Sequence, residues 1–123
     1  MILVDTSVWV DHLREPIEEV ERLAAAVLLV QHPFVTGELA LGTLKNAEAV
    51  LFYLSEDLPK ARIASEPEFL AFVANERISG TGIGFVDAHL LASCRLMPGT
   101  LLWSRDKKLR RWAEKAGLGR ASR

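Results

Sequence analysis

The sequence has only one cysteine in 123 residues, Cys94, so an internal disulfide is excluded. Cys94 lies in the apolar run 88–96, where we expect a small core residue rather than a nucleophile or a metal ligand. Long hydrophobic runs are also lacking, and the longest, residues 23–30, is too short to span a bilayer. The first residues resemble neither a basic leader nor a cleavable apolar segment. These absences predict a soluble protein of the cytoplasm with no membrane association.

Low-complexity and disorder-promoting segments are missing as well. Half of the residues are hydrophobic and a quarter are charged, which is the balance of an ordinary globular domain. A chain of this length buries about two-thirds of the surface that its unfolded form exposes. We therefore expect one domain over residues 1–123 with a core of its own.

The formal net charge of -1 conceals an uneven distribution. Residues 105–123 contain eight Lys or Arg against two acids, which leaves seven basic and fourteen acidic residues in the segment 1–104. A basic tail of this kind could attract a substrate that carries phosphate groups. A helix face that is merely solvated is the simpler alternative.

The opening stretch predicts a buried strand that ends at a carboxylate. Ile2, Leu3 and Val4 are consecutive branched apolar residues, as in a parallel strand covered by helices on both faces. In parallel α/β sheets, ligands bind beyond the carboxyl ends of the strands, where Asp5 would lie. Asp5 could instead serve only as the N-cap of the helix that follows.

Further elements alternate along the chain in the manner of an α/β fold. The clear strands are expected at residues 27–30 and 100–103, with weaker strand signals at 58–63 and near Leu118. We expect helices at 6–13 and 16–26, one that Thr36 caps, one from Asn46 to residue 54, and others at 66–78, 85–96 and 107–115.

Four acids are expected at strand ends or near helix N-termini: Asp5, Glu38, Asp87 and Asp106. Capping and the helix dipole could explain each one separately. Together, four converging carboxylates would repel one another unless a cation lay among them. Oxygen ligands without cysteine or a nearby histidine favour Mg²⁺ or Mn²⁺ over zinc. His89 is about 200° around the helix from Asp87, so we expect a packed or surface histidine there rather than a further ligand.

These motifs, taken in order, resemble the PIN-domain ribonucleases, and in particular the VapC toxins of toxin-antitoxin pairs. The stretches that carry the resemblance are Asp5-Thr6-Ser7 after a strand, Glu38 early in a helix, Gly82-Ile83-Gly84-Phe85-Val86-Asp87-Ala88 opening another helix, and Leu102-Trp103-Ser104-Arg105-Asp106 closing a strand. The resemblance covers essentially the whole chain. It implies a three-layer α/β/α sandwich with a mostly parallel central sheet, and an Mg²⁺- or Mn²⁺-dependent endoribonuclease. It further implies a homodimer that binds a small antitoxin protein.

By position, Asp5, Glu38, Asp87 and Asp106 match the acidic quartet of this family. We expect Asp5 and Asp106 to be the central metal ligands, with the other two acids completing the site directly or through water. The neighbouring hydroxyls are those of Thr6, Ser7 and Ser104, where the family usually has threonine at the last position.

Contacts outside the quartet are less specified by the sequence. Arg105, Lys107 and Lys108 are expected to contact substrate phosphates. No lysine or histidine stands out as a general acid. Four aromatic residues could form partner surfaces, although core positions are the expected ones: Trp9, Phe34, Phe52 and Tyr53.

Three other functions compete with this hypothesis. A phosphatase of the aspartyl-phosphate type would need a second aspartate two residues after the first, where this chain has Ser7. A receiver-type signalling domain would need adjacent acids after the first strand and an aspartate ending the middle strand, and neither is visible. A catalytically inactive domain of the same fold, kept for binding RNA or protein, remains an alternative.

Overall fold

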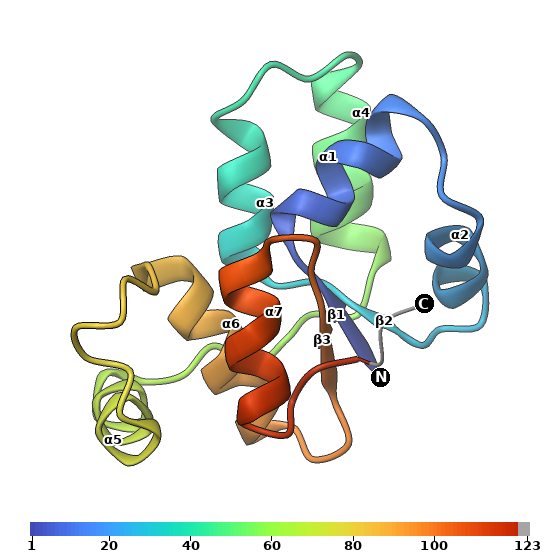
Figure 1. Ribbon diagram of the computed structural model, residues 1–123. Coiled ribbons are helices and arrows are strands. Elements are labelled where there is room, and N and C mark those ends of the chain that lie inside the picture. Colours follow the sequence, from blue (N-terminus) through green and yellow to red (C-terminus); the bar gives the residue numbers. More distant parts are fainter. Residues whose placement is uncertain (121–123) are drawn as a thin grey trace.

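A three-stranded parallel sheet forms the centre of the computed structural model, which describes residues 1–120 (Figure 1). The strand order is β2 (Leu29–Val30), β1 (Ile2–Val4), β3 (Leu101–Trp103). The first strand is therefore central, and both of its neighbours run parallel to it. All three carboxyl ends meet at one edge of the sheet.

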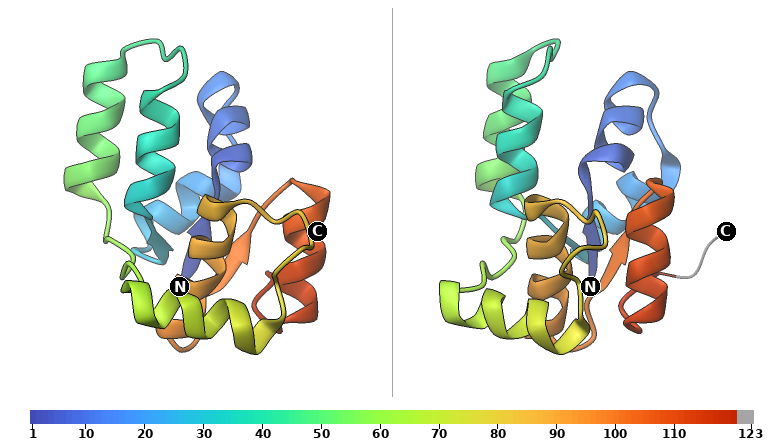
Figure 2. Two further views of the ribbon diagram at one scale, coloured as in Figure 1. Left: turned by 90° about the vertical axis from the view of Figure 1, so that its left-hand side faces the viewer. Right: turned by 60° about the vertical axis from the view of Figure 1, so that its left-hand side comes forward.

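Helices cover both faces of this sheet. They are α1 (Thr6–Arg14), α2 (Glu18–Ala25), α3 (Pro33–Ala40), α4 (Ala47–Phe52), α5 (Glu66–Glu76), α6 (Phe85–Leu96) and α7 (Lys107–Lys115), with a π-helical turn η1 (Tyr53–Asp57) after α4. Helices α6 and α7 lie on opposite sides of the strands (Figure 2). The predicted three-layer α/β/α class is confirmed. None of the helices in residues 1–120 is long and apolar enough to cross a membrane.

The core is centred on the strands, as the apolar runs require. Leu3, Val4 and Leu29 of the strands are completely buried. Leu90 of α6 and Leu109 of α7, on opposite sides of the sheet, are also completely buried. Branched side chains without polar alternation suit a strand with a helix layer on each face. Cys94 is buried among these apolar residues, as predicted, and burial raises the pKa of its thiol to about 12.

Helix α3 begins earlier than the sequence indicated. Thr36 was expected to cap it, but the helix starts at Pro33, and the His32 ring caps it by accepting a hydrogen bond from the Phe34 N–H at 3.0 Å. Proline is suited to the first turn because its φ is fixed and it has no N–H to satisfy. Glu38 therefore lies in the second turn, too far from the helix start for the dipole to explain it.

The second strand is shorter than predicted because the end of α2 takes up its first residues. Val27 has a φ of 56°, and the Leu28 N–H donates to the Leu23 carbonyl at 2.9 Å. This left-handed residue and back-bond form a helix-terminating motif, which leaves Leu29–Val30 as the strand. The weaker signals at 58–63 and near Leu118 correspond to single bridges, Gln31 with Lys60 and Leu102 with Gly119.

Two of the four aromatic residues that we expected in the core are exposed. Trp9 is buried and Phe34 is half-buried, whereas Phe52 is 62% exposed and Tyr53 37% exposed. The prediction of core positions was wrong for these two residues, which lie where α4 passes directly into the π-helical turn. Asn46 also provides no side-chain cap for α4, since it takes a left-handed conformation.

Candidate active site

Asp5 lies at the point where β1 ends and α1 begins. Its backbone N–H donates to the Trp103 carbonyl at 3.1 Å, which fixes it beside β3. Its Oδ1 accepts hydrogen bonds from the Val8 N–H at 3.1 Å and the Ser7 hydroxyl at 2.6 Å, and its Oδ2 accepts from the Ser104 hydroxyl at 2.5 Å. Asp5 is thus the N-cap of α1, and its carboxylate also accepts a hydrogen bond from the segment that follows β3. It is only 3% exposed.

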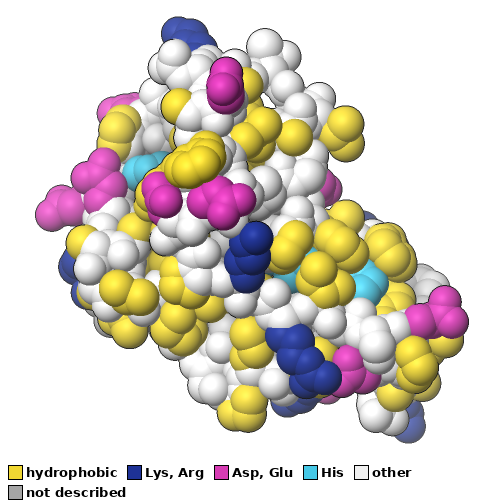
Figure 3. All heavy atoms as spheres, turned by 180° about the vertical axis from the view of Figure 1, so that it is seen from behind, with side chains coloured by type: hydrophobic (Ala, Val, Ile, Leu, Met, Phe, Trp, Pro, Cys, Tyr) yellow, Lys and Arg dark blue, Asp and Glu magenta, His cyan; other side chains and the backbone are white. Residues whose placement is uncertain are grey.

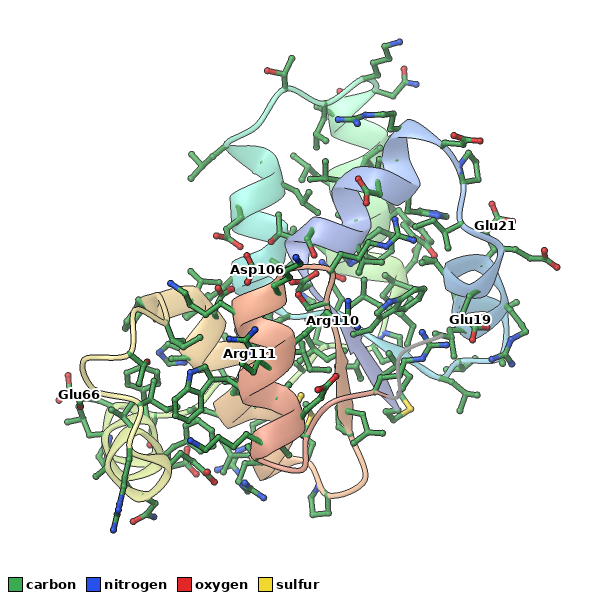
Figure 4. All side chains as sticks on the ribbon, in the orientation of Figure 1. Glu19, Glu21, Glu66, Asp106, Arg110 and Arg111 are labelled. Atoms are coloured by element: carbon green, nitrogen blue, oxygen red, sulfur yellow. The ribbon has the colours of Figure 1, made fainter. Side chains whose placement is uncertain are left out.

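Ser7 and Ser104 connect the two segments that carry Asp5 and Asp106. The Ser7 hydroxyl accepts from the Arg105 N–H at 2.9 Å, and the Ser104 hydroxyl accepts from the Asp106 N–H at 3.0 Å. Asp106 in turn caps α7 by accepting from the Leu109 N–H at 2.9 Å, and its side chain lies at the N-terminal end of that helix (Figure 4). Short polar side chains after a strand suit this role because they bond to nearby backbone groups.

Glu38 reaches the same edge of the sheet from α3. Its Oε1 accepts a hydrogen bond from the Thr6 hydroxyl at 2.6 Å, which links the second turn of α3 to the first residue of α1. Glu38 is exposed, so this bond orients the carboxylate without burying it. The Thr6 hydroxyl, which was predicted to lie beside the acids, thus has Glu38 as its hydrogen-bond partner.

Asp87 is the acid with the least support from hydrogen bonds. It is half-buried in the first turn of α6, and no described residue donates a hydrogen bond to its carboxylate. The pKa of Asp87 is raised to about 6, chiefly by burial and then by the negative charges of Asp5, Asp106 and Glu38 in that order. Asp87 therefore interacts electrostatically with each of the other three predicted acids.

The pKa of Asp5 is also raised, chiefly by burial. Hydrogen bonds from Ser104, Ser7 and the Val8 N–H act in the opposite direction, because they stabilise the charged form. Asp5 is thus a buried carboxylate whose charged form is stabilised by donors from α1 and from the segment that follows β3.

The four acids fit a divalent cation through their charge and their oxygen donors. Within residues 1–120, however, no three His, Cys, Asp or Glu side chains are grouped closely enough to hold an ion directly. Mg²⁺ commonly keeps several of its waters and binds through one or two carboxylates, so it does not require three converging ligands. Asp5 Oδ2 accepts a single hydrogen bond in the described residues, which leaves a lone pair for a ligand.

The family of this chain follows from comparison with known proteins. The family model for the PIN domain matches residues 2–115. The chain belongs to the PIN domain family. It is 40% identical over 121 residues to Ribonuclease VapC32 of Mycobacterium tuberculosis strain CDC 1551 / Oshkosh, and equally to Ribonuclease VapC32 of strain ATCC 25618 / H37Rv. Each alignment covers 98% of this chain and 97% of the relative.

The resemblance to PIN-domain ribonucleases of the VapC kind is thus confirmed. Membership of this family also removes the support for the phosphatase and receiver-domain alternatives, which belong to other folds.

Basic side chains flank the acids of this PIN domain. Arg105 Nη1 forms an ion pair with Asp11 Oδ2 of α1 at 2.7 Å, so part of its guanidinium already has an acidic partner. Lys107 and Lys108 are exposed in the first turn of α7. Lys108 Nζ lies 2.9 Å from the point where a Cβ on Gly82 would stand, so this ammonium group rests against the loop that enters α6.

Sequence reasoning missed the ring cluster that lies behind α6. Of the two expected positions for His89, packed or at the surface, the structure shows the packed one, and its ring stacks on Phe69 with centroids 4.1 Å apart and an interplanar angle of 14°. Phe34 and Phe85 also contact this imidazole. The spacing of Phe85 and His89, four residues apart on one helix, was a signal for a shared face.

Proposed function

We propose that this PIN domain is a divalent-metal-dependent endoribonuclease that uses Mg²⁺ or Mn²⁺. The observation that carries the proposal is the raised pKa of Asp87 beside Asp5, Glu38 and Asp106, because four acids in mutual repulsion favour a bound cation. The names of the two relatives support RNA as the substrate.

The residues of the site would have different roles in holding the metal ion. Asp5 and Asp106 would hold the ion, with Glu38 and Asp87 as direct or water-mediated ligands. A bound divalent cation supplies activation of water and neutralisation of charge on the phosphate. Ser7 and Ser104 orient Asp5, and Thr6 orients Glu38. Within residues 1–120, no lysine or histidine forms a hydrogen bond or ion pair with the four carboxylates, so we assign no general acid.

We further propose that the protein is the toxin of a toxin-antitoxin pair, acts in the cytoplasm and forms a homodimer. Large exposed hydrophobic side chains support binding to protein partners, since they gain from burial. Leu41, in the connection between α3 and α4, is 91% exposed, and Val27, just after α2, is 62% exposed.

Cleavage of a pool of structured RNA tests the nuclease proposal. The purified protein is incubated with Mg²⁺ or Mn²⁺, beside an EDTA control and the variants Asp5→Asn and Asp87→Asn. Because Asp87 has no hydrogen bond from the described residues, Asp87→Asn should preserve the fold, which circular dichroism verifies. We expect metal-dependent cleavage that both variants lose. Cleavage that survives in both variants would indicate a contaminant and refute the site.

The alternative is a catalytically inactive PIN domain that binds RNA or protein. It is favoured by one observation, namely that no three ligand side chains are grouped for direct metal binding in residues 1–120. Titration calorimetry with Mn²⁺ separates the two proposals. Binding that Asp87→Asn weakens supports the nuclease, and an absence of binding together with intact RNA supports the inactive domain.

A further inference from the structure

Four rings from three helices form an aromatic cluster next to the candidate active site, which we call the aromatic platform: Phe34 of α3, Phe69 of α5, and Phe85 and His89 of α6. The His89 ring is its centre, with centroids 5.0 Å from Phe34, 4.1 Å from Phe69 and 4.7 Å from Phe85. Hydrophobic side chains and histidine gather on the side of the molecule that carries α5 (Figure 3).

Phe85 is the exposed member of the platform. Its ring meets His89 at 70° and Phe69 at 57°, so both contacts are made at an angle rather than by full face stacking. The Phe34 ring is more nearly parallel to it, at 23°, but its centroid is 6.4 Å away, near the long limit for ring pairs. With 64% of Phe85 exposed, much of its ring surface is open to a further planar group.

Two helices carry both the platform and the acids. On α3, Phe34 precedes Glu38 by four residues, which is about 6 Å along the helix axis. On α6, Phe85 precedes Asp87 by two residues, or about 3 Å along the axis. Phe85 and Asp87 are about 200° apart around α6, so the platform and the acids share the N-terminal end of this helix but lie on different sides of it.

A cation lies at the same end of α6. The Lys108 ammonium rests against Gly82, three residues before Phe85. A nucleotide offers a flat base and a negative phosphate, which an aromatic ring and a nearby ammonium group complement.

We propose that Phe85, backed by His89 and Phe34, stacks an unpaired base of the RNA next to the phosphate that is cut. This inference rests on the proposed nuclease function and specifies its substrate as RNA with an unstacked base at the cleavage site. Aromatic stacking is the usual way in which proteins hold single-stranded bases, because every base has a π face. The shared helices and the adjacent ammonium favour RNA over a second copy of the chain at this surface.

The test uses a short single-stranded RNA that carries the fluorescent base 2-aminopurine. Binding is measured in EDTA by fluorescence quenching, and cleavage is measured with Mg²⁺. The variants are Phe85→Leu, which keeps an apolar side chain without a ring, and Phe85→Tyr, which keeps the ring. Phe52→Leu is the matched control, because Phe52 is equally exposed but lies on α4.

We expect Phe85→Leu to weaken RNA binding about 5-fold or more and to lose the quenching, as removal of a stacked ring does elsewhere. KM should rise while kcat changes little, since the ring binds a base rather than the reacting phosphate. Phe85→Tyr should retain both properties, and Phe52→Leu should behave as the wild type.

Each contrary outcome has a distinct meaning. RNA that is cut by the wild type and bound equally well by Phe85→Leu overturns the stacking proposal and leaves the nuclease intact. Quenching that depends on Phe85 without cleavage overturns the nuclease and leaves the stacking site. A wild-type protein that shows neither quenching nor cleavage overturns the stacking proposal and the nuclease proposal. A change of sedimentation coefficient in Phe85→Leu with unchanged RNA binding would assign the platform to contact between copies, and would overturn the proposal.

Discussion

Asp5 shows how a buried carboxylate is kept in place at a strand end. Burial raises its pKa, and three hydrogen bonds to its two oxygens oppose that effect. Two of the donors are hydroxyls, and the Ser104 hydroxyl also accepts the Asp106 N–H. Ser104 is therefore a shared partner of the two acids that are expected to hold the ion.

Replacing Ser104 should show this dual role. Ser104→Ala removes the donor to Asp5 Oδ2 and the acceptor for the Asp106 N–H, and both groups lose a partner. We expect the free energy of unfolding to fall by about 1–3 kcal/mol, the usual cost of an unsatisfied buried polar group. Ser104→Thr keeps the hydroxyl and should retain most of the stability. Urea denaturation measures both, and equal midpoints for Ser104→Ala and the wild type would contradict the prediction.

Asp87 should destabilise the metal-free fold at neutral pH. A carboxyl group with a folded pKa of about 6 costs stability once the pH exceeds its unfolded pKa, because the unfolded chain ionises more readily. Asp87→Asn should therefore raise the stability in EDTA at pH 7.5 by on the order of 1 kcal/mol, after allowance for partial exposure. The gain should vanish below about pH 3, where the group is largely protonated in both states because the pH lies below its unfolded pKa of 3.8.

Thermal unfolding of both proteins at the two pH values gives the measurement. Added Mg²⁺ should raise the melting temperature of the wild type more than that of Asp87→Asn, since a cation offsets the repulsion in the wild type. A variant that is less stable than the wild type at pH 7.5 in EDTA would refute the account.

The positions of Asp5, Asp87 and Asp106 could be predicted from sequence because each follows a strand or lies at a helix start, whereas Glu38 proved to lie in the second turn of α3. The partners of the acids could not be predicted. Ser7 and Ser104 were named only as neighbouring hydroxyls, and the bond from Thr6 to Glu38 depends on how α1 packs against α3. The pairing of Arg105 with Asp11 was likewise invisible, because it joins residues 94 positions apart.

At the scale of elements, the link between α1 and α3 is expected to matter for the site more than for the fold. Thr6→Val removes the hydroxyl that orients Glu38, which is exposed and stays hydrated. The free energy of unfolding should change by less than about 1 kcal/mol. Metal affinity should fall about 10-fold or more, as it does when supporting partners of ligands are lost.

Calorimetry with Mn²⁺ measures this affinity, and Thr43→Val provides the control. Thr43 is an exposed threonine in the connection between α3 and α4, where no described hydrogen bond involves its side chain. An equal effect of both substitutions would indicate that the Thr6 hydroxyl has no particular role.

Helix positions were predictable from apolar periodicity, while their ends depended on local hydrogen bonds. Helix α5 has a complete capping box that was not predicted, in which Ser65 and Glu68 satisfy each other's backbone N–H groups. The His32 cap of α3 was also missed, since histidine is not among the preferred N-cap residues. The left-handed Val27 is rarer still for a branched residue.

At the scale of the whole molecule, the uneven charge should appear as salt dependence. Lys107 and Lys108 are exposed on α7 beside the acids, and each phosphate contact of a single-stranded RNA contributes about 0.7 to the slope of log K against log salt. Replacing both lysines with glutamine should reduce the slope by about 1.4 and weaken binding of all RNA sequences alike. Lys45→Gln, far along the chain near α4, should leave the slope unchanged.

The α/β class was predictable because three apolar runs alternate with amphipathic segments. The strand lengths were not, because short strands rely on neighbours for hydrogen bonds rather than on their own composition. The π-helical turn that begins at Tyr53 was not predictable either, because no periodicity indicates it.

The central strand is the first in the sequence, and one of its neighbours, β3, comes from the last quarter of the chain. Ser104 donates to Asp5 across 99 positions, so a chain still emerging from the ribosome lacks both Ser104 and Asp106 until synthesis is almost finished. Shortened translation products that end before β3 cannot assemble the acidic quartet. While the chain is being made, the cell is therefore not exposed to the reaction that the completed acidic quartet would carry out.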